Sequence, residues 1–432
     1  MKIPNIATKS PSEIKLFQQE KLKETLQYVS ENSPFYKSLF TKKNIEISQI
    51  TNLDDLQKLP CTTKNDLQQY NDDFFCVPKS AIIDYVTTSG TLGDPVTVGL
   101  TEKDLVRLTH NEAASLACSG ITSKDTVQLM TTLDRRFMAG LAYFLGLRQL
   151  GASVIRVGSG VPELQWDSIL KFAPTYVICV PSFLLKLAAF ASERKMSISE
   201  TSVKAAICIG EPIRNENFEL NALGKKIKAV WDIDLFSTYA STEMQTAFNE
   251  CEEKKGGHLH PDLIIAEILD ENNQPVSQGT VGELVITTLG IETMPLVRFK
   301  TGDMVQAHTG PCACGRNTMR LGPVVGRKQQ MIKYKGTTLY PPAMYNVLQD
   351  FEQIQSFVIE IFQNDIGTDE ILLKVVSDDI SEAFKDTLKD HFRAKLRVRP
   401  GIEFTTQDRI EILQSPKMSR KPVLLVDRRK DS

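Results

Sequence analysis

The chain has 432 residues, of which 41% are hydrophobic and 24% charged, and a formal net charge of −2. This length predicts at least two domains of ordinary globular composition, and the near-zero charge argues against a nucleic-acid or membrane-surface binder. No apolar run approaches the ~18 residues of a membrane span. Eight cysteines are too few for a disulfide scaffold. With no apolar segment at the N-terminus, they predict a cytoplasmic protein.

The N-terminal hundred residues contain helices and one unusual polar loop. Apolar periodicity predicts a helix over residues 12–30, broken at Pro34, and a shorter helix after residues 62–66. Residues 87–101, TTSGTLGDPVTVGLT, then follow a mostly apolar run typical of a strand end. Glycines and hydroxyls at this density suit a phosphate-binding turn, although the pattern is not GxxxxGK[ST]. Without further signals, an ordinary polar loop is the more common explanation of such a run.

Strand-length and helix-length patterns alternate regularly between residues 126 and 240. Because the strands are largely apolar, the pattern predicts an α/β fold with a doubly wound, mostly parallel sheet. Ligands of such sheets bind at the carboxyl ends of the strands. The predicted intervening helices are Phe137–Leu150, Leu164–Phe172, Ser182–Lys195 and Asn215–Lys228.

The alternation of strands and helices ends in the last 170 residues. Residues 262–310 read as antiparallel strands joined by turns. After Gly326 we expect a helix from about Ala343, a hairpin, a helix over 381–396 and a strand near 402–405. This is the pattern of a small α+β domain.

Six motifs follow one another along the chain: TTSGTLGDP (87–95), IGEP (209–212), YASTE (239–243), RFKTGD (298–303), GRKQQMIKYKG (326–336) and a lysine in a basic tail, Lys421. In this order they resemble the adenylate-forming superfamily of acyl-CoA synthetases, adenylation domains and luciferases, and most closely the phenylacetate-CoA ligases. The resemblance implies a large N-terminal domain (1–327), which combines doubly wound sheets with an antiparallel subdomain. It also implies a small, mobile α+β C-terminal domain (328–432) with its hinge near Gln329.

The reaction implied by the resemblance is ATP-dependent, AMP-forming ligation of an aryl or short acyl carboxylate to coenzyme A through an acyl-adenylate. The implied cofactors are ATP, Mg²⁺ and coenzyme A. Two alternatives stay open: an adenylating enzyme that transfers the acyl group to a carrier protein or an amine, and a degenerate relative that only binds nucleotide. Neither the acid nor the oligomeric state, including a homodimer, follows from the sequence.

The resemblance assigns site residues by motif. Thr242 and Lys421 would contact the reacting phosphate and carboxylate, and Glu243 would bind magnesium. The other assignments are the triphosphate loop (Thr87, Thr88, Ser89, Gly90, Thr91, Gly93), the adenine and ribose contacts (Gly210, Glu211, Pro212, Tyr239, Ala240, Ser241, Asp303, Arg327) and the acyl pocket (Phe137, Ala139, Gly140, Phe236).

Several of these positions have simpler explanations. Tyr239 could be a core aromatic, Glu243 a residue that caps a following helix, and Asp303 a turn residue. Asp94 stands where many relatives carry Lys, and Gln329 replaces the usual Asp or Lys of the hinge.

Two further features concern charge and cysteine. Arg135 and Arg136 enter a predicted helix and could contact a second carboxylate or coenzyme phosphates, or lie in solvent. The segment PCACGR and the upstream segment NECEEKKGGHLHPD together offer thiolate and imidazole ligands for a closed, structural zinc site. The predicted ligands are Cys251, His258, Cys312 and Cys314, and the alternatives are His260 or His308 as fourth ligand, or no metal.

Overall fold

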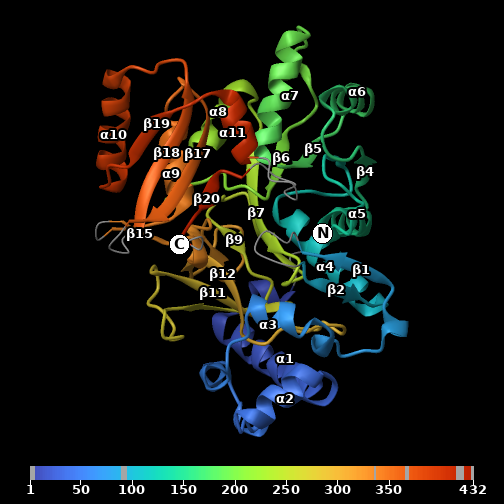
Figure 1. Cartoon of the computed structure of the whole chain (residues 1–432). Helices are drawn as coiled ribbons and strands as arrows, with labels where there is room; N and C mark the ends of the chain where they lie inside the picture. Colours follow the sequence, from blue (N-terminus) through green and yellow to red (C-terminus); the bar gives the residue numbers. More distant parts are fainter. Residues whose placement is uncertain (1–4, 89–94, 335–336, 365–368, 415–422, 430–432) are drawn as a thin grey trace. The chain divides into compact units, whose positions relative to one another are not determined.

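The computed structural model describes residues 5–88, 95–334, 337–364, 369–414 and 423–429 (Figure 1). The chain divides into two compact units. The first comprises Met1–Thr301 and Val305–Pro323, and the second comprises Gly302–Met304 and Val324–Ser432.

The first unit begins with helices whose ends are set by capping residues. Ser10 and Glu13 form a capping box at the start of the first helix. The predicted break at Pro34 is confirmed, because Ser33 ends that helix and caps the next, whose first residue is Pro34. The helices are α1 Pro11–Asn32, α2 Pro34–Lys42 and α3 Lys64–Gln69.

A parallel sheet forms the centre of the first unit, which confirms the predicted fold class. Its strands lie in the order β4-β3-β5-β6-β7, and all neighbours are parallel. One face packs on α4 and α5, and the other packs on α6, α7 and α8, so the sheet is doubly wound. The strands are β3 Thr126–Leu129, β4 Ser153–Arg156, β5 Tyr176–Cys179, β6 Ala205–Ile209 and β7 Asp234–Ser241. The helices are α4 Glu102–Cys118, α5 Met138–Leu150, α6 Pro162–Phe172, α7 Pro181–Glu193 and α8 Ala222–Val230.

Helix α8 begins later than the sequence predicts. The expected start was Asn215, but residues 214–220 form a turn closed by a bridge between Arg214 and Leu220. The side chain of Asn215 accepts hydrogen bonds from the turn backbone, and Asn221 caps the helix at Gly224 N. Asparagine thus competes with the helix for backbone donors, which a periodicity pattern does not register.

Antiparallel strands extend this sheet and form a separate hairpin. Strands β7, β8, β9, β13 and β12 pair antiparallel in that order, and the predicted antiparallel pair of β10 and β11 is confirmed. The hairpin of β1 Asp84–Thr87 and β2 Thr97–Leu100 stands apart. The remaining strands are β8 Thr246–Glu250, β9 Gly257–His258, β10 Ile264–Leu269, β11 Val281–Thr288, β12 Phe299–His308 and β13 Arg320–Leu321.

The second unit is an α+β structure with its own core. A four-stranded sheet has the order β19-β18-β17-β20, and Leu388 and Phe392 of α10 are buried in the cluster that includes Ile359 and Leu373. None of the helices described is both long and apolar enough to cross a bilayer. The elements are β14 Gly326–Arg327, β15 Ile332–Tyr334, β16 Thr337–Leu339, α9 Pro341–Gln349, β17 Ile354–Gln363, β18 Asp369–Ser377, α10 Glu382–Leu396, β19 Gly401–Phe404, α11 Gln407–Gln414 and β20 Leu425–Asp427.

Candidate active site

The predicted triphosphate loop joins the two strands of the β1–β2 hairpin. Thr88 is buried and closes the base of this loop: its backbone N–H donates to Val96 O at 3.0 Å, and its hydroxyl accepts from Val96 N–H at 3.0 Å. Thr87 ends β1. The other loop residues assigned from the sequence, Ser89, Gly90, Thr91 and Gly93, lie outside the described residues, as does Asp94.

The two arginines before α5 lie against this hairpin. Arg135 and Arg136 both adopt left-handed backbone conformations, with φ of 59° and 57°, and both side chains are exposed. The carbonyl of Arg136 accepts a hydrogen bond from Thr87 N–H at 3.1 Å. The turn is therefore tied to the strand that enters the predicted phosphate loop, and its guanidinium groups stay accessible to solvent.

The residues assigned to an acyl pocket have packing roles in this structure. A Cβ atom at Gly140 would lie 2.0 Å from Thr132 O, so only glycine lets α5 approach that backbone so closely. Phe236 is buried in the core cluster beneath α4 and α5, and Ala139 packs against the same cluster. Phe137 precedes the first turn of α5. Contact of these four residues with an acyl group stays a prediction.

The loop after β6, assigned to adenine, is anchored from two sides. Gly210 has φ of 74°, a conformation that suits glycine. The carboxylate of Glu211 accepts from the backbone N–H and the hydroxyl of Ser182, both at 3.0 Å, and so caps the start of α7. Pro212 O accepts from the side chain of Asn221 at 2.9 Å.

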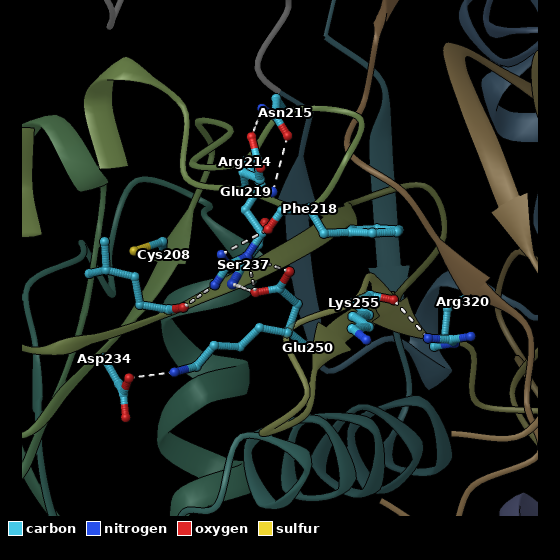
Figure 2. A network of polar contacts seen from close by, with 12 residues as sticks. Cys208, Arg214, Asn215, Phe218, Glu219, Asp234, Ser237, Glu250, Lys255 and Arg320 are labelled. Atoms are coloured by element: carbon cyan, nitrogen blue, oxygen red, sulfur yellow. Dashed lines mark hydrogen bonds and ion pairs between the residues drawn. The ribbon is translucent and has the colours of Figure 1, made fainter. Parts of the chain in front are cut away.

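A buried ion pair holds the end of this loop against β7 and β8 (Figure 2). Arg214 donates to Glu250 Oε1 at 2.9 Å and to Leu235 O at 2.9 Å. Glu250 Oε2 in turn accepts from Ser237 N–H at 2.8 Å. The sequence analysis missed this pair, because nothing local relates an arginine after one strand to a glutamate in another.

The YASTE segment spans the end of β7 and the turn into β8. Tyr239 lies in β7, half-buried, with its ring centroid 5.9 Å from that of Phe248. Ala240 and Ser241 end the strand, and Thr242 and Glu243 lie in the turn. The alternative that Glu243 caps a helix is wrong, because the chain passes directly from the turn into a strand.

The carboxylate of Glu243 has a cationic neighbour that the sequence analysis missed. Lys64 Nζ, at the start of α3, lies 3.4 Å from Glu243 Oε1. Both side chains are largely covered, with exposed fractions of 25% and 11%. The only sequence signal is that Lys64 stands in the segment LPCTTKNDL, itself part of the family resemblance.

Asp303 and Arg327, both assigned to ribose, lie opposite each other. Asp303 in β12 pairs with Arg327 in β14, and Arg327 Nε lies 3.5 Å from Asp303 Oδ1. Asp303 is therefore a strand residue rather than a turn residue. The compact units place both residues in the second unit, whereas the sequence prediction assigned them to the N-terminal domain.

Three thiols and one imidazole converge in the first unit. The ligand atoms of Cys251, His258, Cys312 and Cys314 all lie within 4.8 Å of one another. The Sγ atoms of Cys251 and Cys312 are 3.7 Å apart, and Cys314 Sγ lies 3.5 Å from His258 Nε2. A tetrahedral zinc site with Zn–S bonds of about 2.3 Å and a Zn–N bond of about 2.0 Å needs edges of about 3.8 Å and 3.5 Å.

The choice of histidine follows from hydrogen bonding. Thr318 Oγ1 lies 2.8 Å from His258 Nδ1, which leaves Nε2 directed at the thiols. His260 Nε2 instead bonds Ser115 Oγ at 2.8 Å, and the His308 ring packs edge-on against Phe218. The geometry therefore favours His258 over both alternatives.

The doubly wound sheet and the acidic turn after β7 fit the class that the six motifs resemble, the adenylate-forming enzymes, and comparisons with known proteins show the family. The family model described as AMP-binding enzyme matches residues 15–293. The chain is 31% identical to the phenylacetate-coenzyme A ligase of Thermus thermophilus, over 88% of this chain and 84% of that protein. It is 29% identical to the phenylacetate-coenzyme A ligase of Escherichia coli, over 82% of this chain and 80% of that protein.

A solved structure shares the fold over nearly the whole chain. The 2-hydroxyisobutyryl-CoA ligase in the postadenylation state, in complex with R3-HIB-AMP, aligns with a TM-score of 0.85 at 22% identity. The alignment covers 99% of this chain and 92% of that chain. This chain belongs to the AMP-binding enzymes and, among them, to the phenylacetate-CoA ligase family. The family predicted from the six motifs is confirmed.

Proposed function

We propose that this protein is an ATP-dependent, AMP-forming acid–thiol ligase, which converts an aryl or short acyl carboxylate to its acyl-adenylate and transfers the acyl group to coenzyme A. The observation that carries this proposal is the position of Glu243. It follows the carboxyl end of β7, where ligands of such sheets bind, and it belongs to the YASTE segment that carries part of the family resemblance.

The chemistry explains why charged groups gather there. A carboxylate that attacks the α-phosphate of ATP brings two anions together, so the site must supply positive charge and hydrogen-bond donors. Glu243 is a hard oxygen donor that would hold Mg²⁺, and the orphaned amide oxygen of Gln245 nearby fits such a site. A bound Mg²⁺ supplies charge neutralisation at the phosphate oxygens.

The chain's own residues would do the rest. Lys64 offers a cation beside Glu243. Tyr239 and the loop Gly210–Pro212 would bind adenine. Family resemblance assigns ribose to Asp303 and Arg327, the phosphate loop to residues 87–93, and the reacting carboxylate and α-phosphate to Thr242 and Lys421.

The Cys251–His258–Cys312–Cys314 cluster supports a proposed structural zinc site. Two of its edges, Cys251–Cys312 and Cys314–His258, have the lengths of a tetrahedral site, and four protein ligands leave no position for substrate, so the metal would stabilise two loops rather than catalyse. Eight free thiols, ATP and coenzyme A suit a reducing compartment, and we propose the cytoplasm.

Two measurements test the reaction separately. Purified protein is incubated with Mg²⁺, ATP and a panel of aryl, branched and dicarboxylic acids. We expect carboxylate-dependent ATP–pyrophosphate exchange with at least one of them. With coenzyme A added, mass spectrometry should detect the acyl thioester. Failure of every acid to support exchange contradicts adenylation, whereas exchange without thioester identifies a different acceptor, such as a carrier protein or an amine.

A further inference from the structure

A buried glutamine two residues after Glu243 has an unsatisfied polar atom. The side chain of Gln245 is 1% exposed, and its Oε1 has no hydrogen-bond partner among the residues that the structure describes. An amide oxygen buried without a partner costs about 1–3 kcal/mol, so such an atom calls for an explanation.

The backbone of Gln245 is also held in an unusual conformation. Its φ is 49°, in the left-handed region that favours glycine. A buried arginine maintains this turn: Arg107 donates to Gln245 O at 2.8 Å, to Leu263 O at 2.6 Å and to Leu289 O at 2.6 Å. The surrounding structure thus enforces a local strain, which directs the glutamine side chain inward.

Glu243 and Gln245 border the same small cavity. Its volume is about 10 Å³, which is the space that one water molecule needs. The other lining side chains are apolar: Leu67, Val96, Val98, Met294 and Leu296. Glu243 and Gln245 are thus the polar residues among those that line a mostly apolar cavity, and the carboxylate of one and the amide oxygen of the other are hydrogen-bond acceptors.

A single water molecule would fill this volume and could donate one hydrogen to the unpartnered Gln245 Oε1 and one to the carboxylate of Glu243. We propose that one buried water bridges Gln245 Oε1 and the Glu243 carboxylate, and that Gln245 thereby orients Glu243 toward the divalent cation of the nucleotide. Gln245 is in this sense a positioning residue. The inference deepens the proposed function, since it rests on Glu243 as the cation ligand.

The test compares two buried glutamines. Gln245→Met keeps the length of the side chain but removes the hydrogen-bonding amide, and Gln245→Asn keeps an amide with room for the water. Gln128→Met is the matched control. Gln128 is also fully buried with an unpartnered Oε1, but it lies in β3, where its side-chain amide donates to Gln165 O of α6. Binding of Mn²⁺ to each protein with a non-hydrolysable ATP analogue is followed by electron paramagnetic resonance, and stability by thermal unfolding.

We expect Gln245→Met to weaken Mn²⁺ binding about tenfold, as loss of an outer-shell partner does in other metal sites. Gln245→Asn should recover most of that loss, and Gln128→Met should change only the unfolding temperature. Equal Mn²⁺ affinity in Gln245→Met and wild type, or equal losses in both Met variants, overturns the proposal.

A crystal structure of the wild-type protein gives a second measurement if the variants fail to fold. It should show one water within hydrogen-bond distance of both Gln245 Oε1 and a Glu243 oxygen, and a direct contact or an empty cavity contradicts the proposal. Neither measurement needs turnover. Failure of the proposed reaction would appear instead in the exchange and thioester assays of the wild-type protein.

Discussion

At the scale of single residues, the acidic turn after β7 combines groups that lie far apart in the chain. Glu243 faces Lys64 at 3.4 Å, and the carboxylate is only 11% exposed. A lysine this close to Glu243 disfavours binding of a magnesium ion alone to that carboxylate, since the two positive charges would repel. It suits a site where an anionic phosphate lies between or beside them.

Replacement of Lys64 by Met should therefore lower ATP–pyrophosphate exchange about 10²-fold, the loss typical when one charge-stabilising donor is removed. Lys64→Arg should retain part of the activity because the charge remains. Lys58 offers a control: it pairs with Asp55 at 2.8 Å and is largely exposed, so Lys58→Met should stay within about twofold of wild type. Exchange at the wild-type rate in Lys64→Met would contradict a role in binding phosphate.

At the scale of elements, the packing of α4 on α5 buries an acid without a cationic partner among the described residues. Glu112 is 5% exposed, and a Cβ atom at Gly146 of α5 would lie 2.5 Å from Glu112 Cβ. The side chain accepts a hydrogen bond from Asn111 at 3.1 Å. Burial nevertheless raises the pKa of Glu112 to about 8.

The folded state then binds more protons at this site than the unfolded state between pH about 4.5 and 8, so stability should fall as pH rises through that range. Glu112→Gln should remove this part of the slope and stabilise the protein at pH 8 by about 1–3 kcal/mol. Urea unfolding from pH 5.5 to 8.5 measures both effects. The control Glu20→Gln, at an exposed position of α1, should leave the slope unchanged, and an identical slope in Glu112→Gln would contradict the assignment.

At the scale of the whole molecule, the cysteine–histidine cluster connects segments distant in sequence. Cys251 follows β8, His258 lies in β9, and Cys312 and Cys314 precede β13. A metal at this point would cross-link the chain between Cys251 and Cys314. The adjacent strands β9 and β8 pair in turn with β7, which contains Tyr239. Such a cross-link is expected to stabilise the fold.

Protein purified without chelator should contain about one zinc per chain by mass spectrometry of the metal. Removal of the metal, or Cys312→Ser, should lower the unfolding temperature by several degrees, and addition of zinc should restore it only in the wild type. Cys208→Ser, at a buried thiol in β6, is the control and should keep its zinc. Absence of zinc from the purified protein would rule out the metal site.

The sequence by itself determined the α/β class, the run of parallel strands, the antiparallel segment and the family. Alternating apolar runs and loops such as TTSGT are local signals that a few consecutive residues carry. Six motifs in order identify a family without knowledge of which residues are in contact. The four candidate metal ligands were also visible, since thiolates and imidazoles are chemically distinctive. Capping by Asn221, which shortened the predicted α8, was a local signal that periodicity alone overlooked.

Only the tertiary structure decided which of these groups meet. Three contacts join residues from separate elements: Lys64 with Glu243, Arg214 with Glu250, and His258, rather than His260, with the three thiols. The same holds for the buried oxygen of Gln245 and the cavity it shares with Glu243. Local sequence sets backbone conformation over a turn or two, but distances between side chains depend on how whole elements pack, and periodicity carries no information about that packing.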